Sequence, residues 1–316
     1  MEPIQTPTPK SFLTRVGIYS KEMFPVLIYL PYVVALYVCL NFSVQAISGD
    51  VISMDIYGIV GMITAFFIML EMRTFDDLKD IEIDKDLFPW RATPRKAVLK
   101  SDIQILSVFS FVVLVSTNII FGQKTIFVFA FMMVYAILTF KWFFAEEFHR
   151  KNLLFTMATH QPLPWVINYF LIHTALASGD TYDYFSTNHW ILLAIFSLPI
   201  TAWEVSRKIR AVGHETHYET FSMIFGTRPA TWIPFVCLLL TGLLSIYIAN
   251  DLGLNQSFFW ITGALMFYVI FIYGRFLKSP TVENNNLTNT AMIFTTAVFL
   301  NFLVHVLMNY EVVNQL

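Results

Sequence analysis

The chain reads ISMDIYGIVGMITAFFIMLEMRTFDDLKDIEIDKD from residue 52 to residue 86, so that an apolar run passes directly into a cluster of carboxylates. The run over 52–75 is long enough to cross a bilayer, because the hydrocarbon core takes about 20 residues of helix. Charged side chains close to the end of a membrane helix are costly and usually have a function. The stretch therefore predicts a transmembrane helix that ends in a functional acidic motif.

The composition of the whole chain also indicates a membrane protein. Of the 316 residues, 56% are hydrophobic and only 13% are charged, whereas soluble domains average about 25% charged residues. The net charge of −2 suggests neither nucleic acid nor an acidic polymer as partner, and we expect no nucleic acid. Cys39 and Cys237 lie in apolar runs, where unpaired thiols are expected rather than a disulfide framework.

Apolar runs of similar length recur along the chain. They fall at 23–47, 52–75, 102–121, 124–142, 153–177, 188–206, 230–250, 256–277 and 288–309. The first run continues past the length of a signal-peptide core, so we expect it to be a retained span. In the fifth run, His160, Gln161 and Pro162 predict a kink or a protein-lined cavity. The sequence thus predicts an all-α polytopic membrane protein with nine transmembrane helices, as a single domain over 1–316 with a polar N-terminal segment over 1–22.

The distribution of basic residues predicts the orientation. With the N-terminus inside, all of the 20 Lys and Arg residues except Lys124 fall on one side of the membrane. Because cytoplasmic loops are enriched in Lys and Arg, we expect the N-terminus and the polar loops 76–101 and 207–229 on the cytoplasmic side. The chemistry is expected at that same face.

The first acidic motif contains Asp76, Asp77, Asp80 and Asp84. If the helix continues, the last three share one face within about 60°, and such a row of like charges repels itself. A divalent cation removes the conflict, and carboxylates around a cation that also binds substrate phosphates are usual for Mg²⁺. The segment 76–80 also matches the DDxxD pattern of enzymes that ionise allylic diphosphates. The alternative is a solvated helix end without a ligand.

Basic residues that suit phosphate lie in both polar loops. Arg91 comes after the turn residue Pro89 and presents a rigid fork for phosphate oxygens. After the sixth run, Glu204 offers a carboxylate opposite the first motif, and three basic residues could neutralise a departing pyrophosphate: Arg207, Lys208 and Arg210. Glu204 and Lys208 are four residues apart, so a simple ion pair within one helix is the alternative.

Three further polar positions lie near or within the fourth and fifth runs. Lys141 is expected near the inward interface, where the alternative is an anchor whose charged end reaches the lipid headgroups. His160 and Gln161 lie about two turns into the membrane and need partners there, so we expect them to face the bundle. A structural hydrogen bond beside the kink is the alternative to a role in substrate binding.

These residues together resemble the UbiA superfamily of intramembrane prenyltransferases, which has nine helices, NDxxDxxxD after the second and DxxxD after the sixth. The segment 76–84 matches the first pattern with Asp76 in place of Asn. Pro89-Trp90-Arg91 resembles the Pro-x-Arg-Pro turn of the family, and the spacing of Tyr135 and Lys141 resembles its Tyr-x5-Lys. DxxxD is absent, since the segment from Glu204 to Lys208 stands there with a displaced Glu215. The chain therefore resembles a divergent subgroup.

The resemblance implies a helical bundle around a central cavity, Mg²⁺ as cofactor, and a prenyl diphosphate, the lipid bilayer and an aromatic or lipophilic acceptor as partners. It implies a membrane-embedded, Mg²⁺-dependent enzyme that ionises an allylic isoprenoid diphosphate and transfers the prenyl group. The expected metal ligands are Asp76, Asp77, Asp80, Asp84, Glu204 and Glu215. The expected catalytic residues are Asp77, Asp80, Lys141 and Arg207. The expected substrate-binding residues are Arg91, Tyr135, Lys141, His160, Gln161, Arg207, Lys208 and Arg210.

Other functions remain open at this point. A UbiA-type terpene cyclase, in which the substrate's own double bonds capture the cation, is the main alternative. Transporter sites lie near the bilayer midplane and often between inverted repeats. An ion-coupled transporter is disfavoured here, because the carboxylates are expected at one face of the membrane. A CDP-alcohol phosphotransferase is disfavoured too, since its Gly-containing Asp motif is missing.

Overall fold

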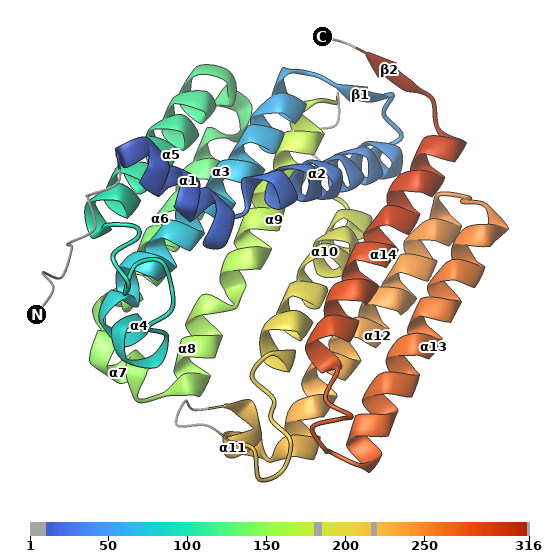
Figure 1. Ribbon diagram of the computed structural model, residues 1–316. Helices are drawn as coiled ribbons and strands as arrows, with labels where there is room; N and C mark the ends of the chain where they lie inside the picture. The colour runs from blue at the N-terminus through green and yellow to red at the C-terminus, as the bar shows by residue number, and fades with distance from the viewer. Residues whose placement is uncertain (1–10, 180–184, 216–219, 315–316) are drawn as a thin grey trace, which may run out of the picture. The chain divides into compact units, whose positions relative to one another are not determined.

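The computed structural model describes residues 11–179, 185–215 and 220–314 and is almost entirely helical there (Figure 1). It divides into two compact units. Unit 1 comprises Met1–Val34 and Met62–Ile120, and unit 2 comprises Ala35–Gly61 and Phe121–Leu316. The all-α class is confirmed, while the single domain predicted over 1–316 stays a prediction.

The elements follow one another with short connections. The helices are α1 (Phe12–Glu22), α2 (Val26–Ser48), α3 (Ile56–Lys79), α4 (Ile81–Leu87), α5 (Lys100–Phe121), α6 (Ile126–Phe140), α7 (Glu146–Arg150), α8 (Leu153–His160), α9 (Pro162–Ala177), α10 (Thr187–Ser206), α11 (Phe221–Phe225), α12 (Thr227–Asp251), α13 (Gln256–Lys278) and α14 (Leu287–Asn309). The 3-10 turns η1 (Gln123–Thr125) and η2 (Trp142–Phe144) flank α6, and β1 (Ile52–Met54) and β2 (Val312–Asn314) are short strands.

Eight helical segments of the described residues are long and apolar enough to cross a membrane: α2, α3, α5, η1 with α6, α10, α12, α13 and α14. They coincide with eight of the nine predicted runs, which confirms a polytopic membrane protein. The remaining run, 153–177, forms the two shorter helices α8 and α9, so a ninth span stays a prediction. The predicted interruption is confirmed, because Pro162 begins α9 and cannot continue the hydrogen bonds of the preceding helix.

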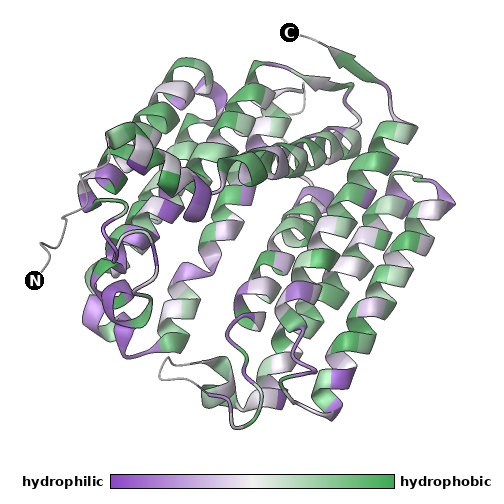
Figure 2. Ribbon diagram, viewed as in Figure 1, coloured by the Kyte–Doolittle hydropathy of each residue, from purple (hydrophilic) through white to green (hydrophobic). Residues whose placement is uncertain are grey.

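Unit 1 is held together by an apolar cluster at the N-terminal helix. Tyr19, Met23 and Phe24 of α1 and its end pack against Leu70 of α3 and Ala92 of the loop after α4. A polar contact reinforces the packing at the other end of α1, where the Arg15 guanidinium donates from Nε and Nη2 to both Asp102 oxygens, at 2.6 and 2.8 Å. Figure 2 shows hydrophilic residues concentrated in α4 and the following loop. The cluster thus positions α1 against the end of α3.

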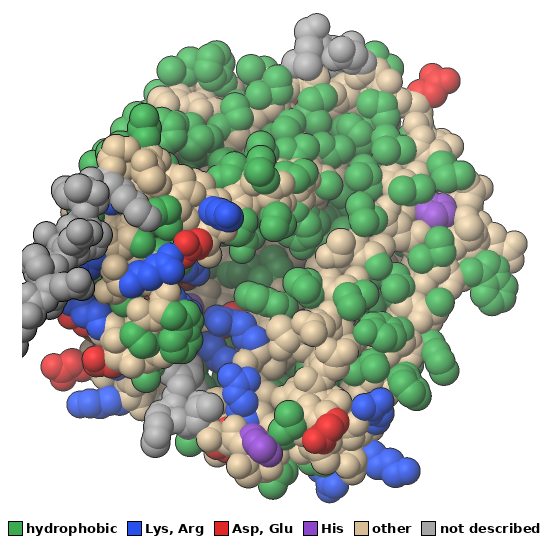
Figure 3. All heavy atoms as spheres, viewed as in Figure 1, with side chains coloured by type: hydrophobic (Ala, Val, Ile, Leu, Met, Phe, Trp, Pro, Cys, Tyr) green, Lys and Arg blue, Asp and Glu red, His purple; other side chains and the backbone are tan. Residues whose placement is uncertain are grey.

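In unit 2, α10, α12, α13 and α14 lie side by side (Figure 1). The Phe196 and Phe299 rings stack between α10 and α14 with centroids 4.5 Å apart. Figure 3 shows hydrophobic side chains along these helices and charged side chains near their ends. The strand β2 pairs in parallel with β1, with Ser53 opposite Val313.

A buried ladder of side-chain hydrogen bonds runs along α2 within unit 2. Gln45 Nε2 donates to Asn41 Oδ1 at 2.6 Å, and Asn41 Nδ2 donates to the Tyr37 hydroxyl at 3.0 Å. Tyr37 in turn contacts Thr174 Oγ1 of α9 at 3.1 Å, and Gln45 Oε1 accepts from the Ser53 backbone at 2.8 Å. Because lipid offers no alternative partners, the ladder fixes α2 to α9 and β1.

The ladder generates a prediction about stability. The substitution Tyr37→Phe removes the hydroxyl that accepts from the buried Asn41 amide. Because the amide then lacks its acceptor, we expect the free energy of unfolding to fall by about 1–3 kcal/mol. Thermal unfolding in detergent micelles measures the change. Tyr247→Phe, which removes the hydroxyl of an exposed tyrosine in α12, is the matched control and should leave the melting temperature unchanged. Equal melting temperatures for the two variants would contradict the role of the ladder.

Candidate functional site

The acidic motif lies where α3 ends and α4 begins, within unit 1. Asp80 separates the two helices with φ −96° and ψ 8°. Its N–H still donates to the Asp76 carbonyl at 3.0 Å, and the Asp84 N–H donates to the Asp80 carbonyl at 2.8 Å. The helical condition under which Asp77, Asp80 and Asp84 share one face is therefore interrupted at a single residue, Asp80. Repulsion among neighbouring carboxylates disfavours the continuous helix, which accounts for a break here.

Asp77 is the centre of this site. Its carboxylate is 4% exposed, accepts the Tyr19 hydroxyl at 2.9 Å and forms an ion pair with Arg73 Nη2 at 2.8 Å. It also lies close enough to Asp76 and Asp84 to interact with their charges. Burial and the Asp77 charge raise the pKa of Tyr19, so that Tyr19 stays protonated and acts as the donor.

Asp84 is the second buried carboxylate of the motif, also 4% exposed. Arg91 Nη1 donates to both of its oxygens, at 2.8 and 2.9 Å, while the Arg91 guanidinium lies 4.1 Å from the centre of the Phe88 ring. The loop after α4 folds back over the motif, and Arg91 contacts a carboxylate there, whereas it was predicted to bind phosphate. Asp76, in contrast, is exposed and lies 3.5 Å from Lys79.

Two residues of this site were absent from the sequence-based prediction. Arg73 precedes Asp77 by four residues on the same helix, and that spacing is a signal that could have indicated the pair. Tyr19 lies 58 residues before Asp77, and no local pattern connects the two.

The second polar segment closes α10 in unit 2. Arg207 donates from Nε to Glu204 Oε2 at 2.5 Å and from Nη2 to Glu204 Oε1 at 2.7 Å, and Lys208 Nζ lies 3.0 Å from the same Oε1. The alternative of an ion pair within the segment is thus what the structure shows. Arg210 Nη1 donates to the Arg207 carbonyl at 2.9 Å. Glu215 is exposed and accepts the Thr220 hydroxyl at 2.7 Å.

The polar residues of α6 and α8 contact one another within unit 2. The Tyr135 hydroxyl donates to the Thr159 carbonyl at 2.9 Å, and His160 Nε2 lies 3.2 Å from the Thr139 carbonyl. Both contacts join α6 to α8, as the alternative of a structural hydrogen bond predicts. Lys141 follows α6, is exposed, and lies 5.1 Å from the centre of the Phe140 ring.

Gln161 occupies the break between α8 and α9 and lines a groove of about 480 Å³ in unit 2. Its Oε1 is buried and has no hydrogen-bond partner among the described residues. The other lining residues are mostly apolar: Leu154, Met157, Ala158, Pro162, Trp165, Leu198 and Thr201. The mostly apolar lining of this open groove suits contact with a hydrophobic molecule.

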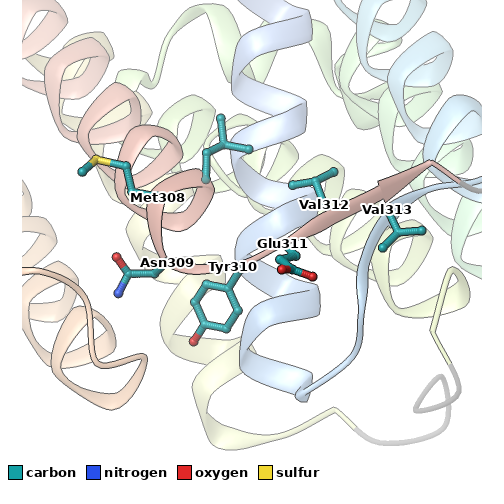
Figure 4. A pocket seen from close by; sticks show the side chains of 7 residues that line it. Met308, Asn309, Tyr310, Glu311, Val312 and Val313 are labelled. Atoms are coloured by element: carbon teal, nitrogen blue, oxygen red, sulfur yellow. The ribbon is translucent and has the colours of Figure 1, made fainter.

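A second groove, of about 550 Å³, lies at the C-terminal end of α14. Figure 4 shows Tyr310 and Glu311 at this place, before β2. None of the residues that line it is a predicted site residue.

The residues of the acidic motif fit Mg²⁺ in chemistry. Within 11–179, 185–215 and 220–314, no group of three or more acidic, histidine or cysteine side chains is arranged to hold a metal ion. A prearranged cage is not required, because Mg²⁺ is usually held by one or two carboxylates together with substrate phosphates. Asp77 and Asp84 offer such hard oxygen donors. The further expectation, that Glu204 completes the same site around a central cavity, concerns both units and stays a prediction.

No protein-family model and no curated protein matches the sequence. Solved structures similar to the chain include one of digeranylgeranylglyceryl phosphate synthase, with 13% identity and a TM-score of 0.64, covering 93% of this chain and 99% of that one. They also include the apo structure of a UbiA homolog from Aeropyrum pernix K1, with 11% identity and a TM-score of 0.62, covering 86% of this chain and 98% of that one. The chain therefore has a UbiA-like fold, as its motifs predicted.

The contact between Tyr19 and Asp77 generates a second prediction. Tyr19→Phe leaves one oxygen of a buried carboxylate without its donor, so we expect the free energy of unfolding to fall by about 1–3 kcal/mol. The melting temperature of the purified protein in detergent measures it. Tyr29→Phe is the control from the same unit, because the Tyr29 ring stacks on Phe24 and the substitution keeps that ring. If the Tyr19 variant has the same melting temperature as the control variant, the contact between Tyr19 and Asp77 does not contribute to stability.

Proposed function

We propose that this chain, whose fold is shared with UbiA-type prenyltransferases, is a membrane-embedded, Mg²⁺-dependent enzyme. It ionises an allylic isoprenoid diphosphate and transfers the prenyl group to an aromatic or lipophilic acceptor. The observation that carries the proposal is a pair of buried carboxylates, Asp77 at the end of a membrane-spanning helix and Asp84 in the short helix α4 that follows it. Ionised groups at such a place are costly and are usually retained for a function.

The metal ligands in this proposal are Asp76, Asp77, Asp80, Asp84, Glu204 and Glu215. When bound, Mg²⁺ would supply Lewis-acid stabilisation of the charge that develops on the leaving pyrophosphate. Tyr19 and Arg73 orient the Asp77 carboxylate, and Asp80 offers its carboxylate between α3 and α4.

The basic residues act on the leaving group. Arg91, Lys141, Arg207, Lys208 and Arg210 neutralise pyrophosphate as it departs. A site that excludes water strengthens this effect, because a low dielectric magnifies each charge interaction.

The groove at the break between α8 and α9 suits the apolar part of a substrate. Its lining by Met157, Trp165 and Leu198 can accommodate an isoprenoid chain, and an aromatic face stabilises a nearby cation. Gln161 Oε1 can accept a hydrogen bond from a substrate hydroxyl, while His160 and Tyr135 hold α8 against α6. The distribution of Lys and Arg supports a cytoplasmic location for the polar loops.

A UbiA-type terpene cyclase is the second candidate function. The observation that favours it is the pairing of Glu204 with Arg207 and Lys208, which departs from the two-carboxylate motif of the transferases that this chain resembles. The two reactions differ in whether an acceptor is needed.

The proposed function predicts that Asp77→Ala and Asp80→Ala each lower Mg²⁺-dependent pyrophosphate release by at least about 100-fold, because they remove charge that holds the metal. Release from farnesyl and geranylgeranyl diphosphate is measured with protein in detergent micelles. Glu146→Ala, which removes an exposed carboxylate paired with Arg150, is the control and should retain full turnover. Size-exclusion profiles show whether the variants remain folded. Unimpaired turnover in the folded Asp77 or Asp80 variant would refute the assignment.

Products distinguish the two candidate reactions. We expect pyrophosphate release to depend on an added lipophilic or aromatic acceptor, with mass spectrometry showing the prenylated acceptor. Release of a cyclic hydrocarbon without any acceptor would replace transfer by cyclisation.

A further inference from the structure

Arg73 differs from Arg15, which also pairs with a buried carboxylate in unit 1, in how its hydrogen-bond donors are used. Arg15 directs both Nε and Nη2 to Asp102, so that its fork matches one carboxylate. Arg73 directs Nη2 to Asp77, while its Nε is buried and has no hydrogen-bond partner among the described residues. A guanidinium carries five donors in a rigid plane, and a buried donor left unsatisfied is costly. Arg73 therefore has a donor in place for a further acceptor.

Unused hydrogen-bonding capacity also occurs in the loop after α4. Arg91 contacts both Asp84 oxygens through the single atom Nη1, which leaves most of its fork outside that contact. Thr93 Oγ1, two residues further along, is buried and has no partner within the described part of the chain. The Arg73 and Arg91 side chains are each about one-third exposed, so a ligand from solvent can reach both side chains, although Arg73 Nε itself is buried.

We propose that Arg73 is a diphosphate-binding residue that exchanges partners, together with Arg91, during substrate binding. In this structure the two guanidinium groups neutralise Asp77 and Asp84. When a magnesium-bound diphosphate enters, both turn to phosphate oxygens, and the two carboxylates become available to the metal. The inference rests on the proposed function and adds a residue to it.

The balance of charge gives the exchange its direction. A buried carboxylate without a counter-ion is strongly disfavoured, so Asp77 keeps Arg73 until another cation replaces it. A cation that arrives alone must compete with Arg73 for Asp77 and is repelled by the guanidinium. A cation that arrives with a diphosphate brings anionic oxygens, which Arg73 can bind in a fork geometry. Arg73 therefore opposes binding of the bare cation and favours binding of the cation with diphosphate.

These opposite effects are tested with Arg73→Gln. Binding of Mn²⁺ alone, followed by the electron paramagnetic resonance signal of the free ion, should become about fivefold tighter, as expected for loss of a partly exposed ion pair. Binding of labelled inorganic pyrophosphate at saturating Mg²⁺ should become at least about tenfold weaker, because a charge-assisted contact is lost. Arg73→Lys keeps the charge without the fork, so it should bind Mn²⁺ like the wild type and pyrophosphate with intermediate affinity.

Arg150→Gln is the matched control, because Arg150 forms an i,i+4 pair with Glu146 as Arg73 does with Asp77. It should change neither affinity. If Arg73→Gln weakens both ligands together, or changes neither, Arg73 is a structural ion pair and the inference is overturned. If the Gln variant does not fold, the Lys variant still decides, since pyrophosphate affinity equal to wild type overturns the inference. A wild-type protein that binds no magnesium pyrophosphate would overturn the proposed function itself.

Discussion

The negative charge of Asp77 is the constraint on which unit 1 is built. A carboxylate at the end of a membrane-spanning helix cannot remain buried without partners. Arg73 supplies the counter-charge from the preceding turn, and Tyr19 supplies a hydroxyl from α1. The hydroxyl is in place because Tyr19 also belongs to the apolar cluster with Leu70 and Ala92. Packing of α1, folding of the loop after α4 and the orientation of Asp77 are therefore parts of one arrangement.

The helices could be predicted from the sequence because a segment that crosses a bilayer must be apolar over the thickness of the hydrocarbon core. A run of apolar side chains long enough to cross a bilayer leaves little choice of structure, and α3 and α12 begin and end within a few residues of the predicted runs. The break before α9 was predictable as well, because Pro162 acts through its own ring. The break at Asp80 was not predictable in this way, since no proline or glycine marks it.

The same distinction between local and distant contacts applies to the site. The sequence indicated the acidic motif and singled out Arg91, which lies seven residues after Asp84 and pairs with it, although it was predicted to bind phosphate. It also offered the pairing of Glu204 with Lys208 as an alternative, and that pairing is present. The sequence could not indicate that Tyr19 donates to Asp77 or that the Gln161 side-chain oxygen lacks a hydrogen-bond partner among the described residues. Both depend on which helices pack together. Contacts between residues close in the sequence can be predicted from the sequence, whereas contacts between distant segments cannot.

The two polar segments differ in sign, and the difference matters for the proposed chemistry. Around the end of α3, carboxylates outnumber the arginines that neutralise them, whereas at the end of α10 Glu204 is paired with two basic side chains and followed by Arg210. A divalent cation requires an excess of negative charge, and a departing pyrophosphate requires an excess of positive charge. An enzyme that handles both at once needs both kinds of segment. The basic segment at the end of α10 therefore shifts the balance there toward holding the leaving group.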